Sequence, residues 1–168
     1  MLCVIAKLNE EATETLAAIR KAALPDAVLT PLYGHITIAT YTGDNEARFI
    51  RFCKSLLARM RSFPVRYEKI AVLEATSIIV ASPEKSGPLE ALHLGIAEQY
   101  NRFLQPWTQI GQWCPHTTLL YGPDLDLHRI CREMSAFFVP FSAKVSGIEF
   151  SRVLESGYAI VDSVALRP

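Results

Sequence analysis

The sequence has few cysteines, no excess of charge of either sign and no long uninterrupted apolar run. Its four cysteines show no C-x-x-C spacing, so we expect no disulfide framework and a reduced, cytoplasmic protein. Lysine plus arginine equals aspartate plus glutamate at 17 each, which argues against a protein that wraps long nucleic acid. No segment approaches membrane-spanning length without a charge or a turn signal, so no membrane association is expected.

What the sequence does contain is enough apolar material for a sizeable core. Half of the 168 residues are hydrophobic, and this length is typical of one domain that folds without disulfides or metal. A balanced charge remains compatible with a small phosphorylated ligand or with the end of an RNA chain. The composition leaves the oligomeric state undetermined.

The most informative pattern is His-x-Thr, which occurs twice in apolar, β-branched runs. The copies are His35-Ile36-Thr37 and His116-Thr117-Thr118. Because side chains alternate faces along a strand, the imidazole and the last threonine hydroxyl of each copy share one face. Two such strands facing each other would form a site with two imidazoles and two hydroxyls. We therefore predict four catalytic residues: His35, Thr37, His116 and Thr118.

Hydrophobic periodicity and turn residues divide the chain into alternating strands and helices. The order strand, helix, motif strand, helix, strand is expected twice, and a last strand follows a hairpin turn at residues 155–157. Asn9 is expected to cap the first helix. The expected elements are strands at 2–8, 35–41, 65–73, 77–81, 116–121, 141–153 and 158–166, and helices at about 9–23, 46–61, 88–104 and 126–137.

This repetition predicts an α+β fold that is bilobal. We expect a single bilobal domain over residues 1–168, with repeat units of approximately 1–75 and 76–168. Each of the two pseudo-symmetric lobes would be a mainly antiparallel sheet with helices on its outer face. A central cleft would then bring the two motif strands together.

Taken together, these residues resemble the two-histidine phosphoesterase superfamily, and within it the 2′-5′ RNA ligase-like and cyclic phosphodiesterase branch. Beside the two motifs, Gly147-Ile148-Glu149-Phe150 followed by Tyr158-Ala159-Ile160-Val161 looks like the closing strand pair of that family. The resemblance covers nearly the whole chain. It implies a bilobal α+β fold, no metal or other cofactor, and action on 2′,3′-cyclic phosphates or 2′-5′ linkages in RNA ends and nucleotides.

Independently of this resemblance, the histidines and threonines of the two motifs are suited to the hydrolysis of a phosphodiester. Opening a cyclic phosphodiester by in-line attack requires a base that takes a proton from water and an acid that protonates the leaving ribose oxygen. Two histidines across a cleft supply both, and such help is worth roughly 10²- to 10⁴-fold in rate. The threonine hydroxyls can donate hydrogen bonds to the non-bridging phosphate oxygens. The sequence leaves open which histidine is the acid.

Three alternatives remain open at this point. The protein could be an RNA 2′-5′ ligase whose hydrolysis is a side reaction, or a non-catalytic binder of nucleotides or RNA ends. A metal site is the third, because Cys114 and His116 are two residues apart and His35 might join them. The lack of a carboxylate in either motif counts against metal.

Four aromatic residues near the motifs are candidates for contact with a nucleobase. Tyr41 has the strand parity of His35 and is expected at the cleft mouth, where it could stack on a base. Aromatic residues at the other three positions could contact substrate or pack on the core: Tyr33, Trp113 and Tyr121.

The remaining histidines and the basic residues are interpreted as structural or solvated. His93 shares the apolar side of its helix, so we expect it to be packed in the core, and His128 is expected to be solvated. A basic set is expected on an outer, solvated face, with contact to an RNA backbone as the alternative; it comprises Arg48, Arg51, Lys54, Arg59, Arg61 and Arg66.

Overall fold

The computed structural model describes residues 1–24, 32–73, 76–85, 87–154 and 157–168. Its element order confirms the alternation of strands and helices expected from the sequence. The first expected repeat unit contains β1 (Leu2–Leu8), α1 (Glu10–Ala23), β2 (His35–Tyr41), α2 (Glu46–Leu57) and β3 (Phe63–Val72). The second consists of β4 (Ile78–Pro83), α3 (Gly87–Tyr100), β5 (Thr117–Tyr121), α4 (Leu127–Ala136) and β6 (Phe141–Leu154), and β7 (Gly157–Ala165) follows.

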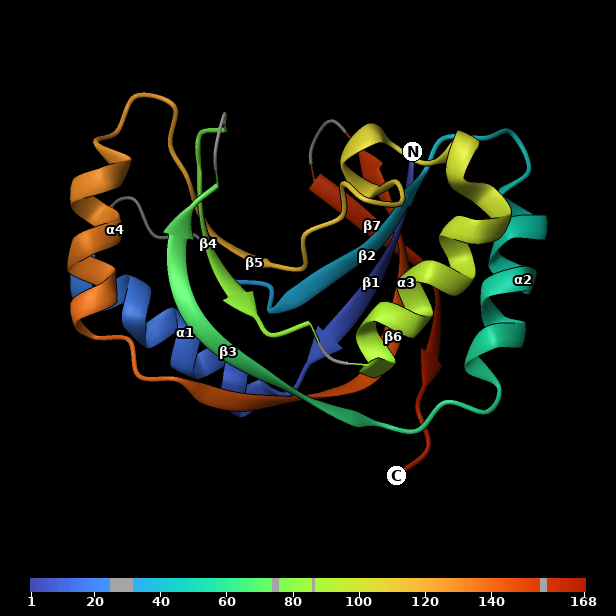
Figure 1. Ribbon diagram of the computed structural model, residues 1–168, viewed down its shortest axis with the longest axis horizontal. Helices are drawn as coiled ribbons and strands as arrows, with labels where there is room; N and C mark the ends of the chain where they lie inside the picture. Colours follow the sequence, from blue (N-terminus) through green and yellow to red (C-terminus); the bar gives the residue numbers. More distant parts are fainter. Residues whose placement is uncertain (25–31, 74–75, 86, 155–156) are drawn as a thin grey trace.

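The seven strands of the described residues belong to one antiparallel sheet with the order β2-β1-β6-β3-β4-β5, and β7 pairs with β6. The long strand β6 joins the two parts of this sheet. Its first residues, Phe141–Val145, pair with β3, and its later residues pair with both β1 and β7. The α+β class is therefore as expected. The motif strands β2 and β5 are the two ends of the strand order and lie close to each other in the middle of the molecule (Figure 1).

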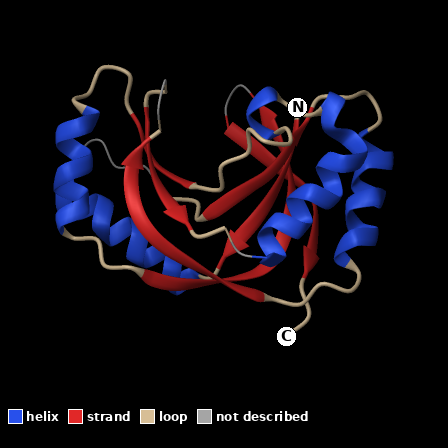
Figure 2. Cartoon of the chain, viewed as in Figure 1, coloured by secondary structure: helices blue, strands red, loops and turns tan. Residues whose placement is uncertain are grey.

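Pairs of helices cover the two parts of the sheet. Helices α1 and α4 pack on each other and on the part that contains β3, whereas α2 and α3 pack on each other and α3 packs on β2 (Figures 1 and 2). None of the described helices has the length and hydrophobicity needed to cross a lipid bilayer. The division into repeat units at residue 75 falls between β3 and β4, which pair with each other, so the two-lobe description stays a prediction.

Side-chain caps begin two of the helices, but not the one expected from the sequence. Asn45 accepts the backbone N–H of Arg48 at the start of α2, and Asp126 accepts that of Arg129 at the start of α4. Asn9 occupies the N-cap position of α1, but its side chain does not cap the helix. Its Oδ1 instead accepts the backbone N–H of Lys144 at 2.8 Å, because β6 presents a competing donor there.

The expected boundaries are corrected at two helices. Helix α2 ends at Leu57 rather than at residue 61, and α3 ends at Tyr100, after which Asn101–Phe103 form a 3-10 turn. Residues 155–156 of the expected hairpin turn lie outside the described residues. The strands on either side, β6 and β7, pair as a hairpin requires.

A β-bulge in β2 determines which side chains of this strand face the candidate site. Val4 pairs with Ala39, but the next residue of β1, Ile5, pairs with Thr37, so that Ile38 is the extra residue. A bulge of one residue reverses the facing of everything that follows it. Consistent with this, Thr40 rather than Ala39 contacts Cys3, with its Oγ1 3.7 Å from the Cys3 Sγ.

Candidate active site

The first motif histidine is held in one tautomer by the backbone. His35 begins β2, and its Nδ1 lies 2.9 Å from the carbonyl oxygen of Tyr33. A carbonyl oxygen can only accept, so the proton of the neutral ring is on Nδ1. The Nε2 of His35 is consequently the atom left to accept or donate a proton elsewhere.

The second motif histidine is held in the same way. His116 immediately precedes β5, and its Nδ1 lies 2.8 Å from the carbonyl oxygen of Cys114. In both motifs the acceptor is therefore the carbonyl two residues before the histidine. The two motifs therefore match in local geometry as well as in sequence. In both histidines, Nε2 is free of these backbone contacts.

Burial lowers the pKa of both imidazoles below the ordinary value. For His35 the hydrogen bond to the Tyr33 carbonyl opposes this effect, the nearby His116 lowers the pKa further and Glu149 raises it. For His116 the hydrogen bond to Cys114 alone opposes burial. The two motifs are in contact through Thr117, the residue after His116, whose hydroxyl donates to the His35 carbonyl at 2.9 Å. Neutral rings with the proton on Nδ1 can act as bases through Nε2.

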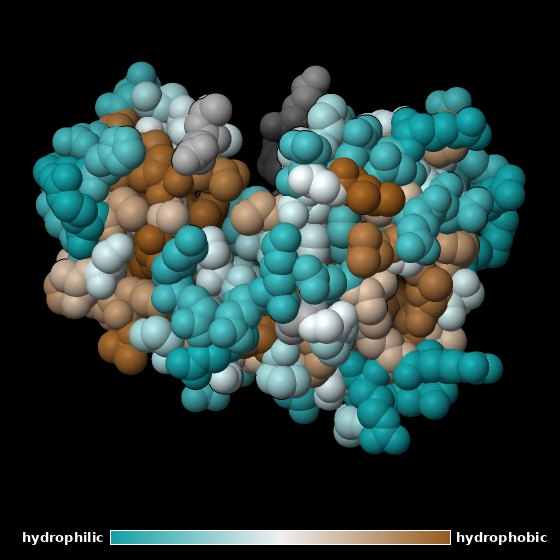
Figure 3. Space-filling model, viewed as in Figure 1, coloured by the Kyte–Doolittle hydropathy of each residue, from teal (hydrophilic) through white to brown (hydrophobic). Residues whose placement is uncertain are grey.

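The two motif threonines differ in exposure. Thr37 is half-buried and lines, together with His35, a cavity of about 80 Å³. Thr118 is exposed on β5, where it pairs with Val80 of β4. The described lining of this cavity contains neither His116 nor Thr118. The space-filling view shows the surface hollowed at the top, above the place where β5 and β2 lie in the ribbon view (Figure 3).

A polar cluster beside His35 was not predicted from the sequence. The carboxylate of Glu149, a residue that is only 8% exposed, accepts a hydrogen bond from the Tyr33 hydroxyl. It also forms an ion pair with Lys7, whose Nζ lies 3.3 Å away. Lys7 pairs with His35 across β1 and β2. A buried carboxylate thus lies close enough to His35 to favour its protonated form.

Tyr158 is a second residue that sequence reasoning missed as a site residue. It lines the cavity of His35, and its ring centroid lies 5.3 Å from that of Tyr33. The Tyr33 ring in turn lies 5.4 Å from the His35 ring. The two tyrosines form an aromatic wall next to the catalytic candidate. Burial and the charge of Glu149 raise the pKa of Tyr158, so its phenol stays protonated.

The structure contradicts the placement of Tyr41 at the mouth of a cleft. Its side chain is 4% exposed and stacks on Phe49 of α2, with ring centroids 4.2 Å apart. The parity argument fails because the bulge at Ile38 turns the later residues of β2 to the opposite face. Tyr41 is therefore a core residue.

Trp113 and Tyr121 were also predicted as possible contacts for a nucleobase, and the structure gives them different surroundings. Trp113 is 8% exposed, stacks on His93 at 4.2 Å and donates its indole N–H to the Thr37 carbonyl at 2.8 Å. It therefore contacts the motif backbone and has one face covered. Tyr121 is 70% exposed at the far end of β5 from His116, and its contact with substrate stays a prediction.

Other titratable residues lie as the sequence indicated. His93 is buried and packed, and His128 is exposed. Within the basic set, Lys54 forms an ion pair with Asp162 and Arg66 with Glu68, while Arg48 and Arg51 are exposed on α2. Among the described residues, no three histidine, cysteine or acidic side chains are clustered as a metal site would require, so the alternative with Cys114 gains no support.

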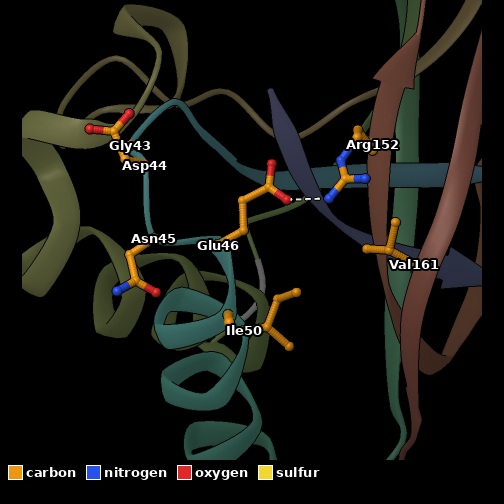
Figure 4. Close-up of a pocket in the computed structure, with 8 residues that line it drawn as sticks. Gly43, Asp44, Asn45, Glu46, Ile50, Arg152 and Val161 are labelled. Carbon is orange, nitrogen blue, oxygen red and sulfur yellow. Dashed lines mark hydrogen bonds and ion pairs between the residues drawn. The ribbon is translucent and has the colours of Figure 1, made fainter.

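A larger cavity of about 580 Å³ lies away from the two histidines. It opens between the start of α2 and the β6–β7 pair, where Glu46 forms an ion pair with Arg152 (Figure 4). None of the predicted catalytic residues lines it. Its size alone does not make it the better candidate, because its described lining contains no histidine and its Glu46 carboxylate is held in the ion pair with Arg152.

Comparison with solved structures identifies relatives of the fold over almost the whole chain. Escherichia coli LigT in its apo form matches with a TM-score of 0.69 and 17% identity, covering 99% of this chain and 97% of LigT. A structure described as a phosphoesterase matches with a TM-score of 0.68 and 19% identity, covering 99% and 98%. A protein from Thermus thermophilus matches with a TM-score of 0.66 and 17% identity, covering 99% and 97%.

At these identities the structural matches establish the fold alone. No curated protein sequence matches. The family is established by the sequence itself, because the profile of the 2′-5′ RNA ligase superfamily matches residues 8–156, a range that contains both His-x-Thr motifs. This chain belongs to the 2′-5′ RNA ligase superfamily.

Proposed function

We propose that the protein is a metal-independent phosphoesterase that acts on 2′,3′-cyclic phosphate or 2′-5′ phosphodiester bonds of RNA ends or nucleotides. The observation that carries this proposal is the matched pair of histidines. Each has its Nδ1 occupied by the carbonyl two residues before it, which directs both Nε2 atoms to the same task of proton transfer. The contact between the two motif segments, in which Thr117 donates to the His35 carbonyl at 2.9 Å, supports the action of both histidines on one substrate.

In the proposed hydrolysis, a water oxygen attacks phosphorus while one neutral imidazole takes its proton at Nε2. The bond from phosphorus to one ribose oxygen breaks, and the other histidine, as imidazolium, donates its Nε2 proton to that oxygen. The product is a phosphomonoester, and exchange of one proton with solvent restores the two rings. Thr37 and Thr118 are proposed to donate hydrogen bonds to the non-bridging oxygens, a contribution of roughly 10²- to 10³-fold for each donor.

Glu149 supports a division of these roles. Burial is the largest effect on His35 and lowers its pKa, and the Glu149 carboxylate partly offsets this by favouring the imidazolium. Among the described residues no acidic side chain has this influence on His116, so we assign His35 as the acid. His116 is then the base that activates water. The sequence alone could not make this assignment, because the two motifs are nearly equivalent.

The aromatic wall of Tyr33 and Tyr158 supports a nucleotide as the substrate. Aromatic side chains offer stacking surfaces for a base, and these two lie beside His35 and Thr37 in one cavity. Solved structures of E. coli LigT hold 3′-AMP, ATP and NADP+ in separate complexes. A small nucleotide ligand is thus proposed for this chain, with RNA contact through the basic face of α2 as an extension. The four described free cysteines suit a reduced, cytoplasmic location.

Ligation is the second candidate, because the family description names a 2′-5′ RNA ligase. Hydrolysis and joining differ in whether water or a ribose hydroxyl attacks the phosphorus. The test is one assay that detects both products. An oligonucleotide with a 2′,3′-cyclic phosphate end is incubated with the protein and a strong chelator, with and without an acceptor strand that has a 5′ hydroxyl.

Accumulation of the phosphomonoester in both reactions supports the proposed hydrolase. A joined product that dominates when the acceptor is present assigns the protein as a ligase instead. Binding without either product contradicts catalysis and supports the non-catalytic alternative. Loss of turnover with chelator, restored by added divalent metal, contradicts the metal-independent mechanism.

A further inference from the structure

At the first motif, the outer edge of β2 is satisfied by side chains where a neighbouring strand would normally supply hydrogen bonds; further along, the Gln105 backbone N–H donates to the Thr40 carbonyl. Among the described strands, β2 pairs only with β1. On its other side, the carbonyl oxygen of His35 accepts from the Thr117 hydroxyl at 2.9 Å. The carbonyl oxygen of Thr37 accepts from the Trp113 indole at 2.8 Å. Both acceptors belong to the first motif, and both donors belong to the segment of the second.

Thr117 is held in turn by a buried tyrosine of β3. The hydroxyl oxygen of Tyr67 lies 2.6 Å from the Thr117 Oγ1, and both residues are fully buried. Thr117 has a single hydroxyl proton, which it donates to His35, so Tyr67 must be the donor in the second hydrogen bond. Burial raises the pKa of Tyr67, which keeps that proton in place. The chain of donors therefore runs from Tyr67 through Thr117 to the His35 backbone.

The hydrogen bond from Thr117 joins the two motif strands through a side chain and not through a backbone ladder. Strands joined by a backbone ladder are about 4.8 Å apart, and directly paired side chains have Cβ atoms about 5 Å apart. That spacing leaves no room for a phosphate between two paired imidazoles. A threonine side chain between the strands adds its own length to the separation. Thr117 begins β5 and directly follows His116, so the added separation acts next to the second imidazole.

We propose that Thr117 is a positioning residue for the acid–base pair, with its hydroxyl, oriented by Tyr67, fixing the separation of the His35 and His116 strands. This inference rests on the proposed function. It also explains why a fully buried strand position, where valine would pack equally well, carries a hydroxyl. Strand alternation directs Thr117 to the opposite face from His116 and Thr118, so it does not contact substrate.

The test compares Thr117→Val, which keeps the shape and removes the hydroxyl, with Thr117→Ser, which keeps the hydroxyl. A displacement of about 1 Å in a catalytic group can cost about 10²-fold in rate, and this is the loss in kcat that we expect for the valine variant. KM should change much less, and the serine variant should recover most of the rate. Tyr67→Phe should also lower kcat. The double variant Tyr67→Phe/Thr117→Val should have a kcat close to that of Thr117→Val alone.

The matched control is Thr108→Val. Thr108 is also fully buried, and its hydroxyl accepts the backbone N–H of Thr40 in the same strand β2, but away from His35. It should lower stability without lowering kcat of the folded protein. A fall in kcat for Thr117→Val that equals the fall for Thr108→Val, or an unchanged kcat for Thr117→Val, overturns the inference.

A second measurement separates this inference from the proposed function. NMR titration of the imidazole nitrogens reports the interaction of His35 with His116, which together with burial, Tyr33 and Glu149 sets the His35 pKa. In the wild-type background, His116→Gln should shift the pKa of His35. In the Thr117→Val background, the same substitution should shift that pKa less. If the wild-type protein has no turnover, the proposed function fails, and this titration alone decides the inference. An unchanged dependence then overturns it.

Discussion

The hydroxyl of Tyr33 donates a hydrogen bond to the carboxylate of Glu149. The carbonyl oxygen of the same tyrosine accepts the Nδ1 proton of His35 at 2.9 Å. One residue therefore contacts both a buried carboxylate and the imidazole of the first motif. This relationship connects strands β2 and β6 and makes the two motif histidines chemically different although their local backbone contacts match.

The substitution Glu149→Gln should reveal which proton transfer His35 performs. Loss of the carboxylate charge removes an influence that raises the His35 pKa, so this pKa should fall. If His35 is the acid, the alkaline limb of the kcat/KM profile moves to lower pH. If His35 is the base, the acidic limb moves instead. The measurement is the pH profile of both proteins.

Glu46→Gln is the control for this profile. Like Glu149→Gln, this variant removes a carboxylate that forms an ion pair. The partner of Glu46 is Arg152, in the separate cavity of Figure 4. Neither limb should move in this variant. An unmoved profile in Glu149→Gln, or equal movement in both variants, would show that Glu149 does not influence the acid–base pair.

Tyr158→Ala should weaken nucleotide binding more than it slows chemistry. The ring forms part of the cavity wall, and stacking of a base on an aromatic side chain is worth about 1–3 kcal/mol. We expect KM for a cyclic nucleotide to rise, with kcat changed less. Phe137→Ala removes another exposed aromatic ring, at the end of α4, and should leave KM unchanged. Equal KM values for both variants would exclude Tyr158 from substrate binding.

The two motif threonines should contribute to rate through their hydroxyl groups. Thr37→Val and Thr118→Val each remove a donor to a non-bridging oxygen, and each should lower kcat by roughly 10²- to 10³-fold. Thr42→Val is the control, because its hydroxyl donates to the Phe103 carbonyl beyond the end of β2. Steady-state kinetics of the three variants check this. A rate near wild type in either motif variant would remove that hydroxyl from the mechanism.

Acidification should destabilise the protein as its buried and partly buried imidazoles become protonated. Burial lowers the pKa of His35, His93 and His116 below the unfolded value near 6.5, so the unfolded chain binds more protons in this range. Their stabilisation is fully present above about pH 6.5 and is lost as the pH falls through the lower folded-state values. Urea unfolding at pH 7.5 and pH 5.5 should show the decrease. A rise in stability over this interval would contradict the neutral state of these rings.

The periodicity of the chain predicted most of the fold because it is a local property. Strands with alternating burial and helices with an apolar face are encoded within a few neighbouring residues, and their order was confirmed. The position of Tyr41 was not predictable in this way. A bulge depends on how β2 registers against β1, and a single extra residue, Ile38, reverses the side of the sheet to which Tyr41 belongs.

The site was predictable only where it repeats a motif. His35 and His116 stand out because the same local pattern occurs twice in the sequence. Glu149 has no such signal, since it reaches Tyr33 across 116 positions and depends on the pairing of β6 with β1. Tyr158 faces the site through the β6–β7 pair in the same way. One indication was available, namely a carboxylate within the otherwise apolar run Ile148-Glu149-Phe150.

Turnover of a 2′,3′-cyclic nucleotide by the wild type, His35→Ala, His116→Ala and the double variant, with chelator present, decides whether the two histidines form an acid–base pair. We predict hydrolysis by the wild type and a loss of roughly 10²- to 10⁴-fold in kcat for each single variant. Because residues that act as a unit are not additive, the double variant should lose little more. Wild-type rates in either folded single variant would contradict the acid–base pair.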